Sequence, residues 1–117
     1  MKDIINKPEL YTQSGDICPI KVVTNLISGK WKILILWYLS QEKRRFGEIQ
    51  RLIPSASKGV LSKQLNELTE SHLITKTVYN QVPPKVEYSL SETGESFTSI
   101  LEVLHIWGND YIEKHYK

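Results

Sequence analysis

The chain has 117 residues, of which 40% are hydrophobic, 24% are charged and 9% are aromatic, with a net charge of +2. This length suits one domain with a single core, and the composition excludes a disordered or fibrous protein. A single cysteine excludes an internal disulfide and a multi-cysteine zinc site, and no apolar run approaches the ~20 residues of a membrane helix.

The N-terminal region shows no clear hydrophobic period over residues 1–17, and we expect a mobile arm or a short lead-in there. Residues 18–117 are expected to form the single folded domain, including its dimerisation helices. Its first helix is predicted over residues 19–28, because Pro19 is tolerated at the first helical position and the following apolar residues recur at helical spacing.

Residues 31–39 are apolar on almost every side, a pattern that fits either a buried strand or a buried helix. Strict alternation is absent, so we predict a central helix that packs against several partners. Residues 45–46 suit a very short strand, and residues 46–53 suit a short helix that ends at Pro54.

A polar helix is predicted over residues 58–71, with Ser57 as its N-cap. Leu61, Leu65 and Leu68 recur at i, i+4 and i+7, so they form one narrow buried stripe. The exposed faces of this helix are then polar and cationic.

A two-stranded hairpin is predicted next. Residues 73–79 are rich in β-branched side chains, and residues 85–90 alternate between apolar and polar. The intervening residues 80–84 contain two prolines, which cannot donate to a strand ladder. The last and longest helix is predicted from about residue 92 to residue 115.

This order of elements is that of a winged helix-turn-helix, a mainly α fold with a small β-hairpin wing. The basic charge lies in the middle of the chain, which includes most of the predicted helix-turn-helix formed by the helices at 46–53 and 58–71. Residues 30–66 carry eight basic and two acidic residues, a net charge of +6, whereas residues 67–117 carry −4. The major groove of B-DNA is ~12 Å wide and admits one helix with polar, cationic side chains. We therefore predict double-stranded DNA as the partner.

The predicted DNA-binding residues lie on the polar helix, just before the helix-turn-helix and at the wing. Lys58 and Lys63 suit phosphate or guanine, and Gln64 and Asn66 suit adenine edges. The full set is Arg45, Ser57, Lys58, Gly59, Ser62, Lys63, Gln64, Asn66, Tyr79, Asn80, Gln81 and Lys85.

Several segments resemble the HxlR-type winged-helix regulators. They are Gly29-Lys30-Trp31, Arg45-Phe46, the stretch Leu-Ser-Lys-Gln-Leu-Asn-Glu-Leu at 61–68, the wing residues 82–94 and Trp107-Gly108. The resemblance spans the chain from about residue 18 to residue 107. It implies a small bacterial transcription factor that binds operator DNA as a homodimer, with an architecture related to that of MarR-type regulators.

An extra apolar face on the last helix also predicts a homodimer, because a monomer would expose it as a large patch. An isologous interface across a two-fold axis would bury this face, and the two subunits would then read a pseudo-palindromic operator. The residues predicted at the interface are Ile20, Val23, Ile27, Leu101, Val103, Leu104, Ile106, Trp107 and Tyr111.

Cys18 is a candidate redox sensor, because the positive end of a helix dipole favours the thiolate. The resemblance implies the same role, since some HxlR-type regulators sense oxidants or electrophiles through an N-terminal cysteine. The alternative is an inert, buried cysteine that serves as a small apolar residue.

No catalytic motif is present, and the three histidines are scattered, so we expect no enzyme activity, no metal and no cofactor. The start of the chain lacks a secretory signal, so a cytoplasmic protein without membrane contact is expected. A winged-helix module that docks proteins and never binds DNA is the alternative function, and the charge distribution favours DNA. The identity of any effector molecule is left open.

Overall fold

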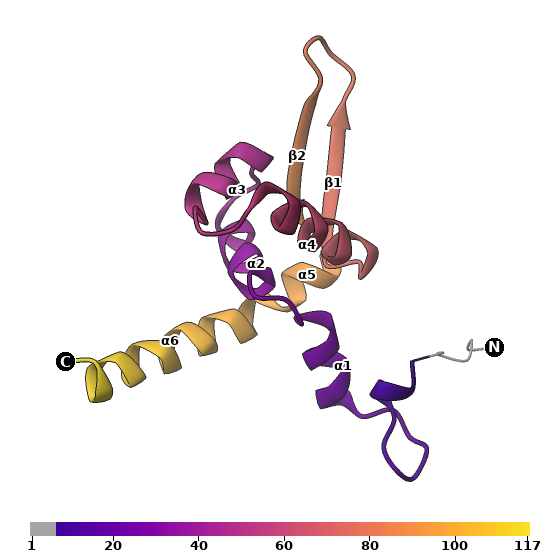
Figure 1. Cartoon of the computed structure of the whole chain (residues 1–117), viewed down its shortest axis with the longest axis vertical. Helices are drawn as coiled ribbons and strands as arrows, with labels where there is room; N and C mark the ends of the chain where they lie inside the picture. Colours follow the sequence, from indigo (N-terminus) through magenta and orange to yellow (C-terminus); the bar gives the residue numbers. More distant parts are fainter. Residues whose placement is uncertain (1–6) are drawn as a thin grey trace.

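The computed structural model describes residues 7–117 and has a helical body, with a hairpin at one end and two projecting helices at the other (Figure 1). The architecture is mainly α with a two-stranded wing, as predicted. In chain order the elements are the 3₁₀ helix η1 (Pro8–Leu10), α1 (Pro19–Leu26), α2 (Lys32–Gln41), α3 (Phe46–Leu52), α4 (Lys58–Glu70), β1 (Ile74–Tyr79), β2 (Lys85–Leu90), α5 (Glu92–Ser96) and α6 (Thr98–His115).

The described part of the predicted arm, residues 7–17, packs against the start of α1. Leu10 is buried, and its carbonyl accepts a hydrogen bond from the Cys18 N–H at 2.8 Å. The Lys21 ammonium donates to the Tyr11 carbonyl at 2.9 Å. These contacts tie η1 to α1. The remainder of the predicted arm, residues 1–6, lies outside the described residues.

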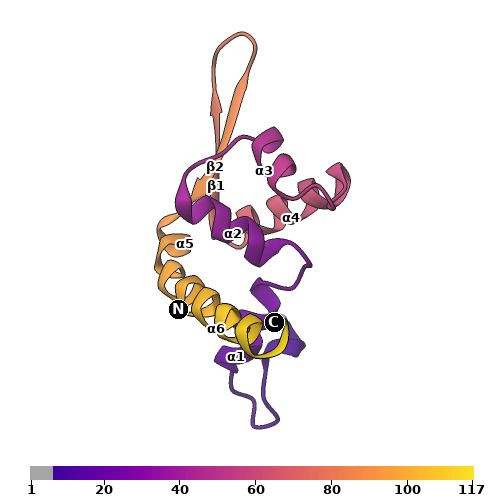
Figure 2. The same cartoon turned by 90° about the vertical axis from the view of Figure 1, so that its left-hand side faces the viewer.

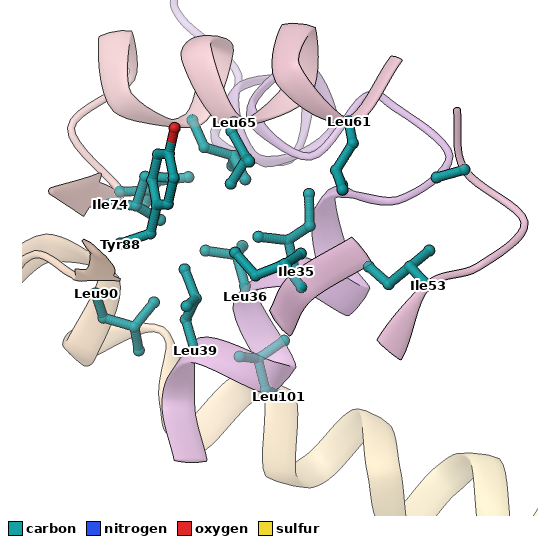
Figure 3. Packing of buried hydrophobic residues seen from close by; sticks show 14 residues of the cluster. Ile35, Leu36, Leu39, Ile53, Leu61, Leu65, Ile74, Tyr88, Leu90 and Leu101 are labelled. Atoms are coloured by element: carbon teal, nitrogen blue, oxygen red, sulfur yellow. The ribbon is translucent and has the colours of Figure 1, made fainter. Parts of the chain in front are cut away.

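The apolar run at 31–39 forms the central helix α2, which settles the choice between strand and helix. Ile35, Leu36 and Leu39 are buried in the core (Figure 3). The helix is surrounded on several sides because α4, β2 and α6 all pack against it. The apolar residues of α2 are therefore buried or half-buried, except Ile33, which is 37% exposed.

The core joins the helix-turn-helix to the rest of the domain. Leu61, Leu65 and Leu68 of α4 are fully buried, which confirms the predicted stripe, and Figure 3 shows the first two facing Ile35 and Leu36 of α2. Burying a leucine side chain stabilises a fold by roughly 1.5–3 kcal/mol. The stripe thus supplies packing, and the opposite side of α4 is free for another role.

The short strand predicted at residues 45–46 is wrong by one residue. Arg44 pairs with Tyr88 of β2 as an isolated bridge, through N–H to carbonyl contacts of 2.9 and 2.7 Å. Arg45 is the N-cap of α3, and Phe46 already begins the helix. One residue of pairing is enough to attach α3 to the base of the wing.

The wing is packed only at its base. β1 and β2 are antiparallel, with Ile74 opposite Leu90 at one end and Tyr79 opposite Lys85 at the other. Ile74 and Leu90 are buried in the core, whereas Val82 in the connecting turn is 99% exposed. The hairpin therefore extends into solvent, as Figures 1 and 2 show.

The single long helix predicted over residues 92–115 is wrong, because the helix breaks at Phe97 into α5 and α6. The Phe97 side chain packs against the core, and its N–H donates to the Gly94 carbonyl at 3.0 Å, a 3₁₀-type contact that closes α5. α6 then leaves the body on the side opposite the wing (Figure 2). None of the helices among residues 7–117 is long and apolar enough to cross a membrane.

Candidate nucleic-acid interface

The side of α4 opposite the leucine stripe is polar and exposed. Lys58, Gly59, Ser62, Lys63 and Asn66 all lie on it, as the sequence predicted. The structure brings these five predicted residues together on one helix. Space around Gly59 is open, because a Cβ there would meet no atom within 4 Å.

The start of α4 is fixed by its predicted cap. The Ser57 hydroxyl accepts a hydrogen bond from the Val60 N–H at 3.2 Å. Such a side-chain cap satisfies one of the N–H groups that have no partner at a helix start. It holds Lys58 and Gly59 in the first turn of the helix.

Gln64 does not belong to this exposed face, so its predicted assignment to the DNA-binding residues is corrected. The side chain is 7% exposed, and its Oε1 accepts a hydrogen bond from the Trp31 N–H at 2.9 Å. A buried amide bound to the protein backbone is not free to bind a base edge. The helical spacing signalled this position, because residue 64 lies at i+3 from Leu61 and i−4 from Leu68.

Exposed basic residues lie on α4 and in the segments that precede it in the chain. Arg45 at the start of α3 is exposed, and its N–H donates to the Glu48 carboxylate at 2.7 Å. Two of the eight basic residues in 30–66 are not exposed. Lys32 is buried beside Glu67, and Arg44 pairs with Glu42 and donates to the Tyr38 carbonyl. The six others are exposed: Lys30, Lys43, Arg45, Arg51, Lys58 and Lys63.

The wing carries a cluster of charges at the end of its two strands. The Lys85 ammonium lies 5.0 Å from the Tyr79 ring centroid and 3.6 Å from the Glu87 carboxylate. The Lys43 ammonium lies 3.9 Å from the same carboxylate. The Tyr79 hydroxyl holds the pKa of the Glu87 carboxyl below its ordinary value, and the two lysines add to this effect. Glu87 therefore stays ionised and orients both lysines.

Lys43 was not identified from the sequence as a residue that pairs with Glu87 of the wing. Residue 43 lies in a charged turn that precedes α3, and no local pattern relates it to a strand that follows more than forty residues later. The predicted tip residues Asn80 and Gln81 are exposed in the turn between β1 and β2. The helix-turn-helix and the wing occupy the same half of the molecule, away from α1 and α6 (Figure 1).

The predicted dimer residues fall into two groups. Leu101 is 2% exposed and belongs to the core, so its assignment to the interface is corrected, and Ile27 is half-buried against the core. The others are exposed on the projecting helices: Ile20 and Val23 on α1, and Val103, Leu104, Ile106, Trp107 and Tyr111 on α6.

The exposed α6 face is ordered by aromatic contacts. Trp107 stacks on Tyr111 with ring centroids 5.5 Å apart, and Tyr111 also contacts His115 and Tyr116. Cys18 is half-buried and is the N-cap of α1. Both features lie on the elements that project opposite the wing.

A family model described as HxlR-like helix-turn-helix matches residues 26–116. YkvN, an HTH-type transcriptional regulator of Bacillus subtilis, is 44% identical over 99 residues, covering 85% of this chain and 84% of the relative. The crystal structure of the Bacillus subtilis regulator YtcD matches with a TM-score of 0.79 at 43% identity, covering 83% of this chain and 99% of that one. The redox regulator HypR, in its oxidised form, matches with a TM-score of 0.76 at 39% identity, covering 80% and 96%.

Proposed function

The chain belongs to the HxlR-like helix-turn-helix family of transcriptional regulators, and from this premise we propose that it binds a pseudo-palindromic operator as a homodimer. The exposed face of α4, with Lys58, Ser62, Lys63 and Asn66, is the observation that carries the proposal. In this proposal α4 is the recognition helix that enters the major groove, and the wing contacts the adjacent backbone. A regulator of this kind works in the cytoplasm, where bacterial DNA lies.

The proposed DNA-binding residues fall into those that contact base edges and those that contact the DNA backbone. Lys63 and Asn66 on α4 suit base edges, while Lys58 near the start of the helix suits phosphate. On the wing, Lys85 and Tyr79 are held together and suit phosphate contacts, and the exposed tip residues Asn80 and Gln81 suit the minor groove. Ser57 and Gly59 let the helix start approach the DNA backbone, and Arg45 flanks it.

The homodimer is supported by the shape of the single chain. Its Cα radius of gyration is 16.5 Å, whereas a compact chain of this length has about 13 Å. The chain is extended because the wing projects from one end of the body and α1 and α6 project from the other, and both of these helices carry exposed apolar residues. An isologous interface between two such faces would bury them. To enter successive major grooves, the two copies of α4 would have to lie about 34–36 Å apart, or a multiple of that distance.

Alanine at Lys58 or Lys63 is expected to weaken DNA binding without weakening the fold. Both side chains are exposed, so the free energy of unfolding should stay within about 0.5 kcal/mol of the original protein. If Lys58 contacts phosphate, Lys58→Ala lowers the slope of log K against log salt by about one per subunit. If Lys63 contacts a base edge, Lys63→Ala lowers operator affinity more than affinity for random duplex. Mobility-shift titrations at several salt concentrations, with operator and random duplexes, measure this slope.

A matched control for these variants is Lys114→Ala, an exposed lysine on α6 at the other end of the domain. It should leave the salt slope unchanged. If both Lys58→Ala and Lys63→Ala bind DNA like the original protein, α4 is not the recognition helix. If the original protein binds no duplex DNA at low salt, the alternative of a protein-docking module stands instead.

Oxidation of Cys18 is expected to weaken operator binding. The thiol lies at the start of α1, two residues before the proposed dimer residue Ile20, and the similar protein HypR is described as a redox regulator. Peroxide oxidises a thiol to sulfenic acid, which condenses with a second thiol to a disulfide, here with a small thiol or the partner subunit. An adduct at this place would disturb the spacing of the two recognition helices.

The test compares mobility shifts before and after peroxide treatment, with Cys18→Ser as the control. The serine variant should bind the operator and keep binding it after treatment. Loss of binding by oxidised Cys18→Ser would make Cys18 an ordinary packing residue.

A further inference from the structure

A buried polar contact joins α4 to the start of α2. The Gln64 amide oxygen accepts a hydrogen bond from the Trp31 N–H at 2.9 Å, across 33 residues of sequence. Trp31 is the N-cap of α2, and the first N–H groups of a helix have no partner within it. The Gln64 side chain therefore caps α2 from a different helix.

A second contact lies next to the first. Lys32 is only 5% exposed, and its ammonium lies 3.2 Å from the Glu67 carboxylate of α4. Gln64 and Glu67 are three residues apart, so both project from the same side of α4. Two directional contacts to adjacent residues of α2 fix how far α4 is rotated and how far it is shifted along its axis.

Gly29 makes this close approach possible. A Cβ at this position would come within 3.1 Å of the Gln64 side chain and 3.2 Å of Lys32 Cδ, and the Gly29 φ angle is +157°. Both the space and the backbone conformation favour glycine. Residues 29–32, which we call the α2 entry segment, thus pack closely around the Gln64 side chain.

Hydrophobic packing alone does not fix a helix in this way. The burial of Leu61, Leu65 and Leu68 is non-directional, whereas hydrogen bonds weaken steeply when their angle changes. Base-edge contacts depend on the exact position of the recognition helix. Phosphate contacts tolerate small shifts of the helix better, because they are mainly electrostatic.

We propose that Gln64 and Lys32 are positioning residues for operator recognition, which hold α4 against the α2 entry segment without touching DNA. The inference rests on the proposed function. It assigns a role to Gly29, Trp31 and Lys32, none of which is among the exposed basic residues of the candidate interface. It also links α1 to α4, because the segment directly follows α1 and the residues that cap its end.

The experiment uses the operator recovered from genomic DNA by the full-length protein. Gln64→Met keeps the length of the side chain and removes the acceptor, Gln64→Glu keeps an acceptor, and Lys32→Met removes the ammonium.

Gln64→Met and Lys32→Met should each lower operator affinity about tenfold, the effect of losing one good base contact. Affinity for random duplex should stay within about twofold, and the salt slope should not change, because no phosphate contact is lost. Gln64→Glu should restore operator affinity.

Leu39→Ala is the control for a general loss of stability, because Leu39 is a buried core residue at the end of α2 opposite to the α2 entry segment. It should lower the melting temperature and leave operator affinity unchanged at a temperature where the protein is folded. If Gln64→Met does not fold, Lys32→Met decides the result by the same measurements.

The inference is overturned if the Met variants bind the operator like the original protein, or if operator and random DNA lose affinity equally. It is also overturned if Lys32→Met lowers the salt slope, which would make Lys32 a direct phosphate contact. If the original protein binds no duplex DNA, the proposed function fails first. If it binds and the variants match it, only the positioning role fails.

Discussion

Alanine at Gly94 is expected to lower the free energy of unfolding by about 3 kcal/mol, at the upper end of what overpacking produces. A Cβ at this position would lie 2.0 Å from the Leu73 carbonyl oxygen and 3.2 Å from Leu90 Cδ2. The first of these is a backbone atom, so no rotamer change relieves the overlap. α5 would have to move away from the start of β1.

The neighbouring contacts make such a movement unfavourable. The Ser91 N–H donates to the same Leu73 carbonyl at 3.1 Å, and the Ser91 hydroxyl donates to the His72 carbonyl while accepting from the Gly94 N–H. Thermal unfolding followed by circular dichroism should show a melting temperature lower by roughly 10–15 °C. The control is Gly59→Ala, where no atom lies within 4 Å of the added Cβ and helix propensity improves. A Gly94→Ala protein as stable as Gly59→Ala would contradict this account.

Glutamate at Trp107 is expected to dissociate the proposed homodimer and to lower operator affinity at least about 100-fold, because joining two binding modules raises affinity by that factor or more. Trp107 is 65% exposed and lies outside the core, so the fold should be unaffected. A charge in the centre of the apolar α6 face would have to be desolvated on pairing. Light scattering should report a mass close to the 13.6 kDa of one chain instead of about twice that value.

Asn109→Glu is the matched control, because it adds the same charge on α6 away from the Trp107 side. Asn109 is exposed and faces His105, with 3.4 Å between their side-chain nitrogens. This variant should keep both the mass and the affinity of the original protein. A Trp107→Glu protein that still scatters as a pair of chains would place the interface elsewhere, and a footprint covering one asymmetric half-site in the original protein would argue against two bound subunits.

Local patterns in the sequence predicted most of the fold. The Leu61, Leu65 and Leu68 spacing identified the buried side of α4, and the alternation over residues 85–90 identified β2 with its observed bounds. Both signals are local, since a helix or strand imposes its period on the residues that it buries. The break at Phe97 was not predictable in this way, because the Phe97 side chain packs against core residues from other parts of the chain.

The exposed residues of the candidate site could be predicted from the sequence, whereas the buried residue Gln64 could not. Lys58, Ser62, Lys63 and Asn66 were placed correctly because a polar residue opposite an apolar stripe faces water. Gln64 was misplaced because its residue type suggested a base contact, although its spacing placed it beside the stripe. A polar residue at a buried helical position indicates a partner within the protein, and the identity of that partner, Trp31, needed the three-dimensional structure.

In the wing, the residues that stabilise the fold lie at the base, and the residues proposed to contact DNA lie at the tip. Its base is tied to the core through Ile74, Tyr88 and Leu90, while its turn, including Val82, makes no contribution to packing. Mutations at the tip are therefore nearly neutral for stability and are free to accumulate. Over evolutionary time, copies of such a gene can acquire new DNA preferences at the tip without first gaining stability elsewhere. Among descendants of one ancestral regulator, Asn80 and Gln81 should then vary most, whereas residues 82–84, which belong to the wing motif shared with the family, and Gly94 should hardly change.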